Sequence, residues 1–288
     1  MTSTNLFDWA SLPLGRAPHV PDARDLKLSS YVDADKLVDS NSCPLAHSWD
    51  TIPTPSGQLP SLDTDPLGNK VANCCVFSAV GHMVKAIGQQ TGVPITVTEE
   101  DVLNAYSIGG YKLDPKLFDN GFNVRVMLKI WKVLGLFGTK ALGYAAVNWN
   151  DPREVALASW LGCGVIAGFN MPLTSQEDSD RLGQLCWSIP VDGFPPGKGP
   201  GSWGRHCVWL NDVSPALSGG NSWGLKAYMT TPWQQQCCEE MWIVLVDKWK
   251  MRDGRAPNGF AFDDLMSDVK ARAAENVAAS TVTSFLLR

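Results

Sequence analysis

An apolar stripe with helical spacing begins at residue 76 and is the clearest pattern in the chain. The spacing i, i+4, i+7, i+8 and i+11 belongs to Val76, Val80, Met83, Val84 and Ile87. Such a stripe predicts an α-helix that packs one face into a core. Prolines and glycines crowd residues 53–68 before it, which predicts an irregular loop. We therefore expect a buried helix that opens at Cys74 and ends near Thr91-Gly92, where glycine supplies a left-handed cap.

Three more helix signals follow. Thr98 is a good capping residue, and the acidic residues 99–101 suit the first turn of a helix. A second apolar stripe stops at Gly135 and consists of Met127, Ile130, Trp131 and Leu134. Asp151-Pro152 places a cap before a proline at the first helical position, and this helix is expected to run to Gly162.

After residue 162 the pattern changes to short apolar runs. Residues 163–169, 207–210 and 242–246 are predicted to be buried strands, and residues 171–204 a long loop rich in proline and glycine. A short helix is expected from Thr231-Pro232, and a last helix over residues 263–279. A mostly helical half followed by a strand-rich half predicts an α+β fold with a cleft between two lobes.

These patterns divide the chain into three parts. Residues 1–60 show no long period and are predicted to be an extended N-terminal arm, which either wraps its own domain or reaches a neighbour. Residues 61–250 are expected to hold the two-lobed domain, with a helical lobe at 61–150 and a strand-rich lobe at 151–250. Residues 251–288 are expected to form a linker and the C-terminal helix.

Composition narrows the classes of partner. Only 18% of the residues are charged, the net charge is −5, and no lysine or arginine cluster stands out, so we expect neither nucleic acid nor membrane as a partner. Residues 1–8 lack the basic start and apolar run of a signal peptide, so a cytoplasmic location is expected. The twelve tryptophans favour a large aromatic core over an aromatic-lined cleft or interface.

The eight cysteines lack the spacing of a metal site. Cys74-Cys75 and Cys237-Cys238 are adjacent pairs, and the other four cysteines stand alone, so no C-x-x-C motif exists. We expect no metal and no cofactor, and in the cytoplasm we expect the thiols to be mostly reduced.

Cys74 is nevertheless placed where a cysteine can become a nucleophile. Unpaired backbone N–H groups and the positive end of the helix dipole meet at the first turn of a helix, which favours the thiolate. A catalytic thiolate also needs a base and a group that orients the base. Candidates for both lie far downstream at His206 and Asn221, 132 and 147 residues after Cys74.

Three motifs in the same order resemble those of papain-like cysteine peptidases. Residues 74–80, Cys-Cys-Val-Phe-Ser-Ala-Val, are similar to the start of their nucleophile helix, and His206-Cys207-Val208 is similar to their histidine strand. Residues 221–224 are their Asn-Ser-Trp-Gly motif unaltered. The spacing also fits, since the histidine and asparagine of these enzymes follow the cysteine by about 130–150 residues. The resemblance covers residues 60–250 and implies a papain-like fold.

The resemblance also implies a role for each matched residue. Cys74 is the nucleophile, His206 is the base that takes its proton, and Asn221 accepts a hydrogen bond from the imidazole. Trp223 shields that bond from water. The backbone N–H of Cys74 is one donor of the oxyanion hole. The family's glutamine for this hole sits six residues before the cysteine, a position that is Gly68 here, and the side-chain amide of Asn69, one residue closer, is the best candidate for the second donor.

Other positions vary the pattern of the family. Asn120 and Gly121 belong to a segment similar to the one that lines the family's substrate cleft. Phe122 and Arg205 stand where the family has glycines, and their bulk is expected to narrow that cleft. Cys75 replaces the tryptophan that follows the nucleophile, so Cys75 stays open as the reactive thiol in place of Cys74.

Two hypotheses of function follow. The first is a thiol hydrolase, specifically a cysteine peptidase of narrow specificity that acts on a peptide or protein substrate. The second is a structural or interaction protein of a phage or bacterial assembly, a virion component that keeps the fold with reduced or no activity and contacts other subunits through its arm. The residues 67–69 that open the cysteine segment resemble a bacterial and phage-encoded branch of the family. Only 73 residues precede Cys74, so we expect no separate inhibitory pro-segment.

Overall fold

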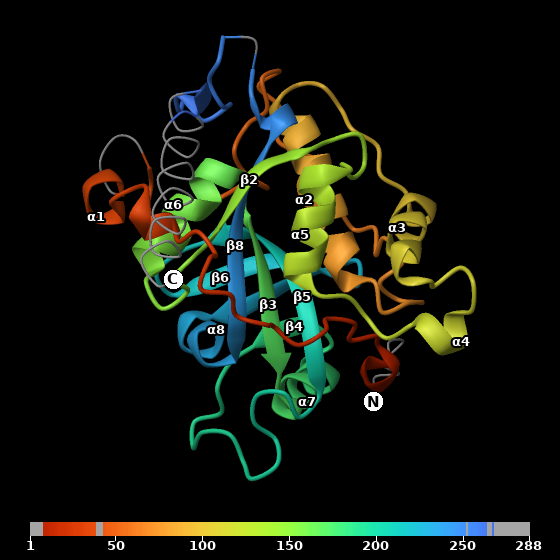
Figure 1. Cartoon of the computed structure of the whole chain (residues 1–288). Helices are drawn as coiled ribbons and strands as arrows, with labels where there is room; N and C mark the ends of the chain where they lie inside the picture. Colours follow the sequence, from red (N-terminus) through yellow and green to blue (C-terminus); the bar gives the residue numbers. More distant parts are fainter. Residues whose placement is uncertain (1–7, 39–42, 252, 264–266, 268–288) are drawn as a thin grey trace, which may run out of the picture.

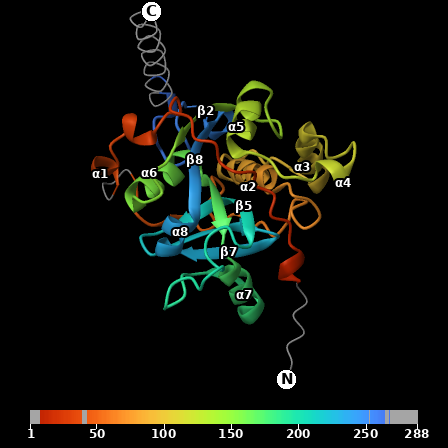
Figure 2. The same cartoon turned by 60° about the horizontal axis from the view of Figure 1, so that its bottom comes forward.

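The computed structural model describes residues 8–38, 43–251, 253–263 and 267 (Figure 1). The helices that gather on one side of the molecule are α2 (Cys75–Gln90), α3 (Glu99–Tyr106), α4 (Pro115–Phe118) and α5 (Val124–Val133). Figure 2 shows this group beside the large sheet, with α2 next to β5 and α5 next to β2. The predicted α+β class, with a helical lobe and a strand-rich lobe, is confirmed.

The sheet joins segments that lie far apart in the chain. Its path is β2-β8-β3-β5-β6-β7-β4, and β1 pairs with β5 beside that path. All described pairings are antiparallel except that of β4 with β7. The bounds are β1 (His47–Ser48), β2 (Ala141–Ala146), β3 (Val165–Met171), β4 (Leu185–Trp187), β5 (Gly204–Val213), β6 (Leu217–Ser222), β7 (Leu225–Thr230) and β8 (Cys238–Val246).

Most predicted helices form close to the expected bounds. Helix α2 begins after Cys74 as its N-cap, and every residue of its predicted apolar stripe is fully buried. Thr98 caps α3 in a capping box with Asp101, and Asp151 caps α6 (Pro152–Gly162). The short helix α8 spans Thr231–Cys237. Leu134 was wrongly placed in the second stripe, because α5 ends at Val133 and Leu134 remains 73% exposed.

The second half holds more structure than its apolar pattern predicts. The expected loop at 171–204 contains α7 (Leu173–Leu182) and β4, and the strands β2, β6 and β7 had no clear signal. Two of these elements, α7 and β6, were not predicted because their buried residues are small and mostly polar. The buried residues of α7 are Thr174, Ser175 and Ser179, and β6 buries a Ser-Gly-Gly-Asn-Ser run. Such residues fit tight packing without hydrophobic periodicity.

The N-terminal arm wraps its own domain. Residues 8–38 contain the short helices η1 (Trp9–Ser11), η2 (Leu28–Ser30) and α1 (Ala34–Leu37), and they run in red across the front of β8, β3 and β5 in Figure 1. Further along, Trp49 stacks on Trp160 and meets the edge of Trp249, which lies in η4 (Asp247–Trp249). Nine of the twelve tryptophans are fully buried, so the aromatic-core prediction is confirmed.

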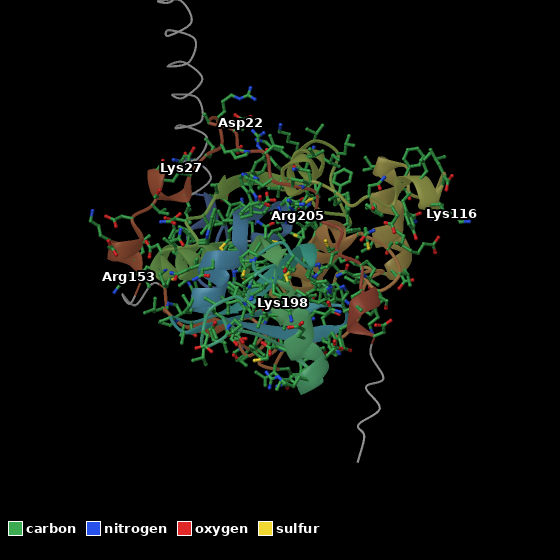
Figure 3. The ribbon with its side chains drawn as sticks, turned by 90° about the horizontal axis from the view of Figure 1, so that it is seen from below. Asp22, Lys27, Lys116, Arg153, Lys198 and Arg205 are labelled. Carbon is green, nitrogen blue, oxygen red and sulfur yellow. The ribbon has the colours of Figure 1, made fainter. Side chains whose placement is uncertain are left out.

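Several predictions concern parts that the structure leaves open. The helix predicted over 263–279 lies almost entirely outside the described residues. The divisions at residues 60, 150 and 250 stay predictions. Among the described residues, no helix has both the length and the apolar character needed to cross a membrane. Figure 3 shows Lys27, Lys116 and Arg153 at separate edges of the molecule.

We predict that Asp151→Ala lowers the free energy of unfolding by ~1 kcal/mol, because the carboxylate accepts a hydrogen bond from the Arg153 backbone N–H at the start of α6. Asp151→Asn keeps an acceptor at that position and is expected to cost clearly less. Urea unfolding of the three proteins measures the difference, and an equal loss in both variants would contradict the capping role.

Candidate active site

Cys74 lies buried at the N-cap of α2. Its Sγ lies 3.4 Å from the hydroxyl oxygen of Ser78 and 3.8 Å from the carbonyl oxygen of Leu67. The residue has no exposed surface, and burial raises the pKa of the Cys74 thiol to about 12. The helix N-terminus was expected to favour the thiolate. In the described state desolvation outweighs that effect, so Cys74 is a neutral thiol at physiological pH.

The sulfur of Cys75 lies on the side of α2 that faces the sheet and the arm. Burial raises the pKa of its thiol to about 11, and the backbone N–H groups of Cys207 and Gly15 act on this sulfur in the opposite direction. Cys75 is therefore close to both the strand that carries His206 and the arm. Both candidate thiols are buried and protonated at neutral pH.

His206 lies on β5 with its ring fully buried. Its Nε2 lies 2.6 Å from the hydroxyl oxygen of Ser222, and the ring stacks on Trp223 with 4.2 Å between ring centroids. Its Nδ1 has no hydrogen-bond partner among the described residues. Burial lowers the pKa of His206 to about 3, and the nearby positive charge of Arg16 acts in the same direction. The imidazole is therefore neutral. Its Nε2 is hydrogen-bonded to Ser222, and its Nδ1 has no partner among the described residues.

Asn221 does not meet His206 in this structure. Its side-chain amide donates a hydrogen bond of 3.1 Å to the carbonyl oxygen of Asp63. Successive side chains of a strand point to opposite faces, so the neighbours Asn221 and Ser222 of β6 are separated by the sheet. Ser222 is the one on the side of the imidazole. It sits inside the same motif, but only the strand pairing reveals which of the two faces His206.

Trp223 packs between His206 and the arm. Besides stacking on the imidazole, its indole N–H donates to the carbonyl oxygen of Pro13 in the arm. Its φ of +50° lies in the left-handed region, which a tryptophan rarely adopts. This backbone strain is held by dense aromatic packing, since Trp187 and Trp203 also contact the Trp223 ring.

The other predicted residues lie on the helical side. Asn69 is buried, and its Oδ1 has no hydrogen-bond partner among the described residues. Asn120 is exposed and donates to the carbonyl oxygen of Leu117. Asp119 organises this segment, because its Oδ1 accepts from the Tyr106 hydroxyl and from the backbone N–H of Asn73, next to the two cysteines.

Gly121 is covered by the arm. A Cβ atom at Gly121 would lie 2.2 Å from the carbonyl oxygen of Gly15, and one at Gly15 would lie 1.9 Å from the carbonyl oxygen of Asn73. Glycine is required at both positions because the two backbones touch.

Residues 13–18 of the arm lie between the two lobes as an extended peptide. The Phe122 N–H donates to the carbonyl oxygen of Gly15, and the Ala17 N–H donates to that of Phe122. On the other side, the Arg16 N–H donates to the carbonyl oxygen of Arg205. We call the strip between residues 121–122 and 204–205 the arm groove. Arg205 and Phe122 were expected to narrow a cleft, and their main chains instead bind the arm.

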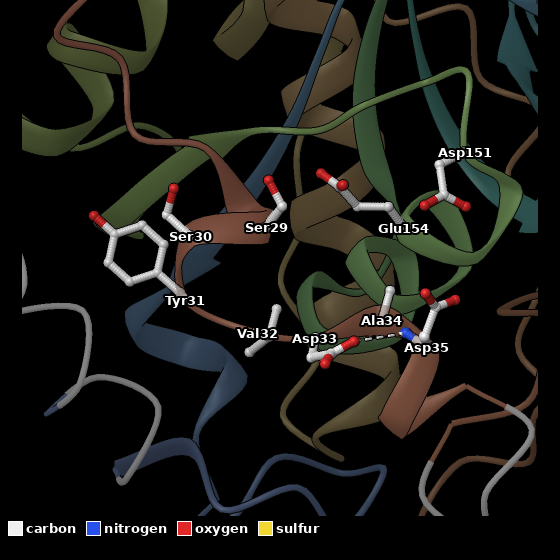
Figure 4. Close-up of a pocket in the computed structure, with 9 residues that line it drawn as sticks. All are labelled: Ser29, Ser30, Tyr31, Val32, Asp33, Ala34, Asp35, Asp151 and Glu154. Carbon is white, nitrogen blue, oxygen red and sulfur yellow. Dashed lines mark hydrogen bonds between the residues drawn. The ribbon is translucent and has the colours of Figure 1, made fainter.

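A cavity lined by acidic groups lies elsewhere. It measures about 380 Å³ and lies between the arm and the start of α6, where Figure 4 shows Asp33, Asp35, Asp151 and Glu154. Asp33 and Asp151 cap helices, and Glu154 accepts from the backbone N–H of Asn148, so local structure already uses these three carboxylates. Among the described residues, no group of three histidine, cysteine or acidic side chains is arranged to hold a metal ion.

The fold is similar to that of a known cysteine protease. A structure of xylellain, described as a cysteine protease from Xylella fastidiosa, superposes with a TM-score of 0.59 at 13% identity, covering 81% of this chain and 96% of that one. A chain from a study of the mite allergens Blo t 1 and Der p 1 gives 0.46 at 11% identity, with 72% of each chain covered. No protein-family model and no curated protein sequence matches the chain. The first match confirms the papain-like fold.

The structure thus brings His206 and Trp223 together and places both cysteines at the start of α2. No hydrogen bond among the described residues joins either cysteine to His206. Sequence reasoning missed Ser222 and the arm residues 13–18. It also missed Glu239 and Glu240, which bind Arg16. Two adjacent acids at the start of a long buried strand were a signal for a cationic partner, but nothing in the local pattern identifies the cation.

We predict that His206 makes stability fall on acidification. Its folded-state pKa of about 3 lies below the ordinary value of 6.5, so protons bind the unfolded state first. Its contribution is therefore intact above pH 6.5 and is lost as the pH falls toward 3, by on the order of 5 kcal/mol in total. Urea unfolding between pH 7 and pH 4 should show a shallower pH dependence for His206→Gln.

The control is His47→Gln, since burial also lowers the pKa of His47, to about 4. The two substitutions should act separately because half-buried His47 contacts Ser159 and Trp160, whereas His206 contacts Ser222 and Trp223. An unchanged pH dependence in His206→Gln would contradict a buried neutral imidazole.

Proposed function

We propose that this protein is a papain-like thiol hydrolase that cleaves peptide bonds with narrow specificity. The observation that carries the proposal is the extended peptide in the arm groove, bound through its backbone to Phe122 on one side and Arg205 on the other. Main-chain hydrogen bonding of this kind recognises extended peptides in general. Two cysteines and a histidine with an available ring nitrogen lie close to this groove.

In the proposed reaction a cysteine at the start of α2 attacks the carbonyl carbon of the peptide. His206 takes the thiol proton and delivers it to the leaving amine, and water then hydrolyses the thioester. The register of the motif favours Cys74 as the nucleophile. The Cys75 sulfur lies beside the arm, and this position favours Cys75 instead. The side-chain amide of Asn69 is proposed to donate to the oxyanion, and Asn120 and Gly121 to line the substrate side.

The described state is proposed to be a resting state. The arm fills the groove, and burial keeps the two thiols and the imidazole neutral. Displacing the arm admits water, which returns the pKa values of these groups toward their ordinary range. In this proposal the arm itself blocks the groove, in the way that a separate inhibitory pro-segment would.

The alternative is a structural or interaction protein that uses the groove without chemistry. Two observations favour this alternative. The imidazole of His206 is neutral, and the Asn221 amide binds the carbonyl oxygen of Asp63 rather than His206. Under it, the arm would exchange between subunits of a phage or bacterial assembly. The experiment below separates the two functions.

We predict that opening the arm produces hydrolysis. A recognition sequence for a site-specific protease is inserted after Val20, which is 64% exposed, so that cutting frees residues 1–20 without removing any part of the chain. The cut protein is incubated with a peptide library at pH 7, and products are read by mass spectrometry. We expect cleavage by the cut protein, little by the uncut one and none by a cut His206→Ala variant.

Alkylation of the thiols provides the second measurement. Cys186 is partly exposed and serves as the internal reference. In the uncut chain Cys74 and Cys75 should react more slowly than Cys186, and after cutting one of them should react faster. A folded, cut protein that neither cleaves the library nor alkylates at either cysteine would favour the non-catalytic alternative.

We also predict that Ser222 orients the catalytic imidazole. In the cut chain, Ser222→Ala should lower kcat by ~10-fold or more, because Nε2 loses its partner. Asn221→Ala should lower it less, because the Asn221 amide binds the Asp63 carbonyl. Steady-state kinetics across pH 5–9 measure both effects. A larger loss in Asn221→Ala would show that the asparagine of the motif moves to the histidine when the groove opens.

A further inference from the structure

Arg16 of the arm is the most deeply buried cation whose partners lie on the sheet. Its side chain has no exposed surface. One terminal nitrogen donates to the Glu240 carboxylate at 2.9 Å, and the other donates to the Glu239 carboxylate at 2.5 Å. The second nitrogen also donates to the side-chain oxygen of Asn170 at 3.0 Å and to the carbonyl oxygen of Phe169 at 3.4 Å. We call the site formed by Glu239, Glu240 and Asn170 the arginine pocket.

The pocket has the shape of an arginine side chain. A Cβ atom at Gly168 would lie 2.7 Å from Cδ of Arg16, 3.0 Å from its Nε and 2.8 Å from Cγ of Glu240. Gly168 lies in the middle of β3, where glycine weakens a strand and marks a close approach. The absence of a side chain at this position is what leaves space for the guanidinium and its stem.

The carboxylates of the pocket have partners besides Arg16. The Glu240 carboxylate also accepts from the Trp242 indole at 2.9 Å and lies 3.0 Å from Nδ1 of His19. Burial opposes ionisation of Glu239, but the Arg16 guanidinium outweighs it and lowers the pKa of that carboxyl. Planar carboxylate partners on both sides suit the fork of a guanidinium better than the single charge of an ammonium.

The backbone of the arm also restricts which residue can precede Arg16. Gly15 lies against Asn73 and Gly121 so closely that a side chain there has no space. Ala17 is bound through its main chain to Phe122, and Leu14 packs its side chain close to Gly204. The polar and steric selectivity of the groove therefore rests on one glycine followed by one arginine.

We propose that the arginine pocket is a recognition site for peptides, and that the arm groove selects extended ligands that carry glycine followed by arginine. The chain's own residues 13–18 are the resident ligand. This proposal deepens the proposed function by naming the peptide class that the groove admits. A purely structural ion pair is the competing explanation, although a buried ion pair is often a weaker source of stability than apolar packing of similar volume.

The test uses the chain cut after Val20, which retains every residue. A fluorescent peptide with the sequence of residues 13–19, Pro-Leu-Gly-Arg-Ala-Pro-His, is added in excess, and anisotropy reports exchange with the cut arm. We expect saturable binding to the cut protein and none to the uncut one. A peptide with citrulline in place of arginine keeps the shape and removes the charge, and it should bind at least 10-fold more weakly.

Variants of the pocket provide the matched controls. Gly168→Ala should weaken binding of the arginine peptide at least 10-fold, because the new Cβ occupies the position beside the arginine stem. Gly199→Ala adds the same atom in an exposed loop, where the nearest contact is 3.7 Å, and should leave binding unchanged. Equal affinities for the arginine and citrulline peptides, or no exchange in the cut chain, would overturn the proposal.

A second measurement covers a cut protein that fails to stay folded. In the uncut chain, Gly168→Ala should speed proteolytic cleavage within residues 8–24, and Gly199→Ala should not. Equal cleavage rates would also overturn the proposal. Binding is measured without turnover, so a cut protein that binds the peptide but hydrolyses nothing contradicts only the proposed function.

Discussion

The ion pairs of Arg16 with Glu239 and Glu240 are the interaction on which the candidate site depends. They fix one residue of the arm to β8 and β3, while the backbone beside it binds Phe122 of the helical side and Arg205 of the sheet. The arm thereby joins the two lobes across the groove. It lies against the start of α2 at Asn73 and beside β5 at Arg205, next to the buried cysteines and His206.

Two opposing effects act on the cysteines at the start of α2. The helix N-terminus favours a thiolate, and desolvation favours the neutral thiol. In the described state desolvation wins, since burial raises the pKa of Cys74 to about 12 and that of Cys75 to about 11. The same burial keeps His206 neutral. A thiolate–imidazolium ion pair therefore requires that these groups become less buried, and it requires no change of residue.

The alternation of side chains along β6 decides which group meets the histidine. Asn221 and Ser222 are adjacent in the chain, and their side chains leave the strand on opposite faces. The pairing of β6 with β5 and β7 turns Ser222 toward His206 and Asn221 toward Asp63. A motif identifies the residues near a site, but a strand shift of one position changes which of them performs a role.

The sequence by itself determined the helices with apolar stripes and caps, namely α2, α3, α5 and α6, and the papain-like fold that its motifs implied, because periodicity and capping are local properties of a segment. Tertiary structure alone decided the strands rich in small residues, the partner of His206 and the place of the arm. These depend on contacts between residues far apart in the chain, such as Arg16 and Glu240, and no local pattern encodes which distant charge a buried side chain will meet.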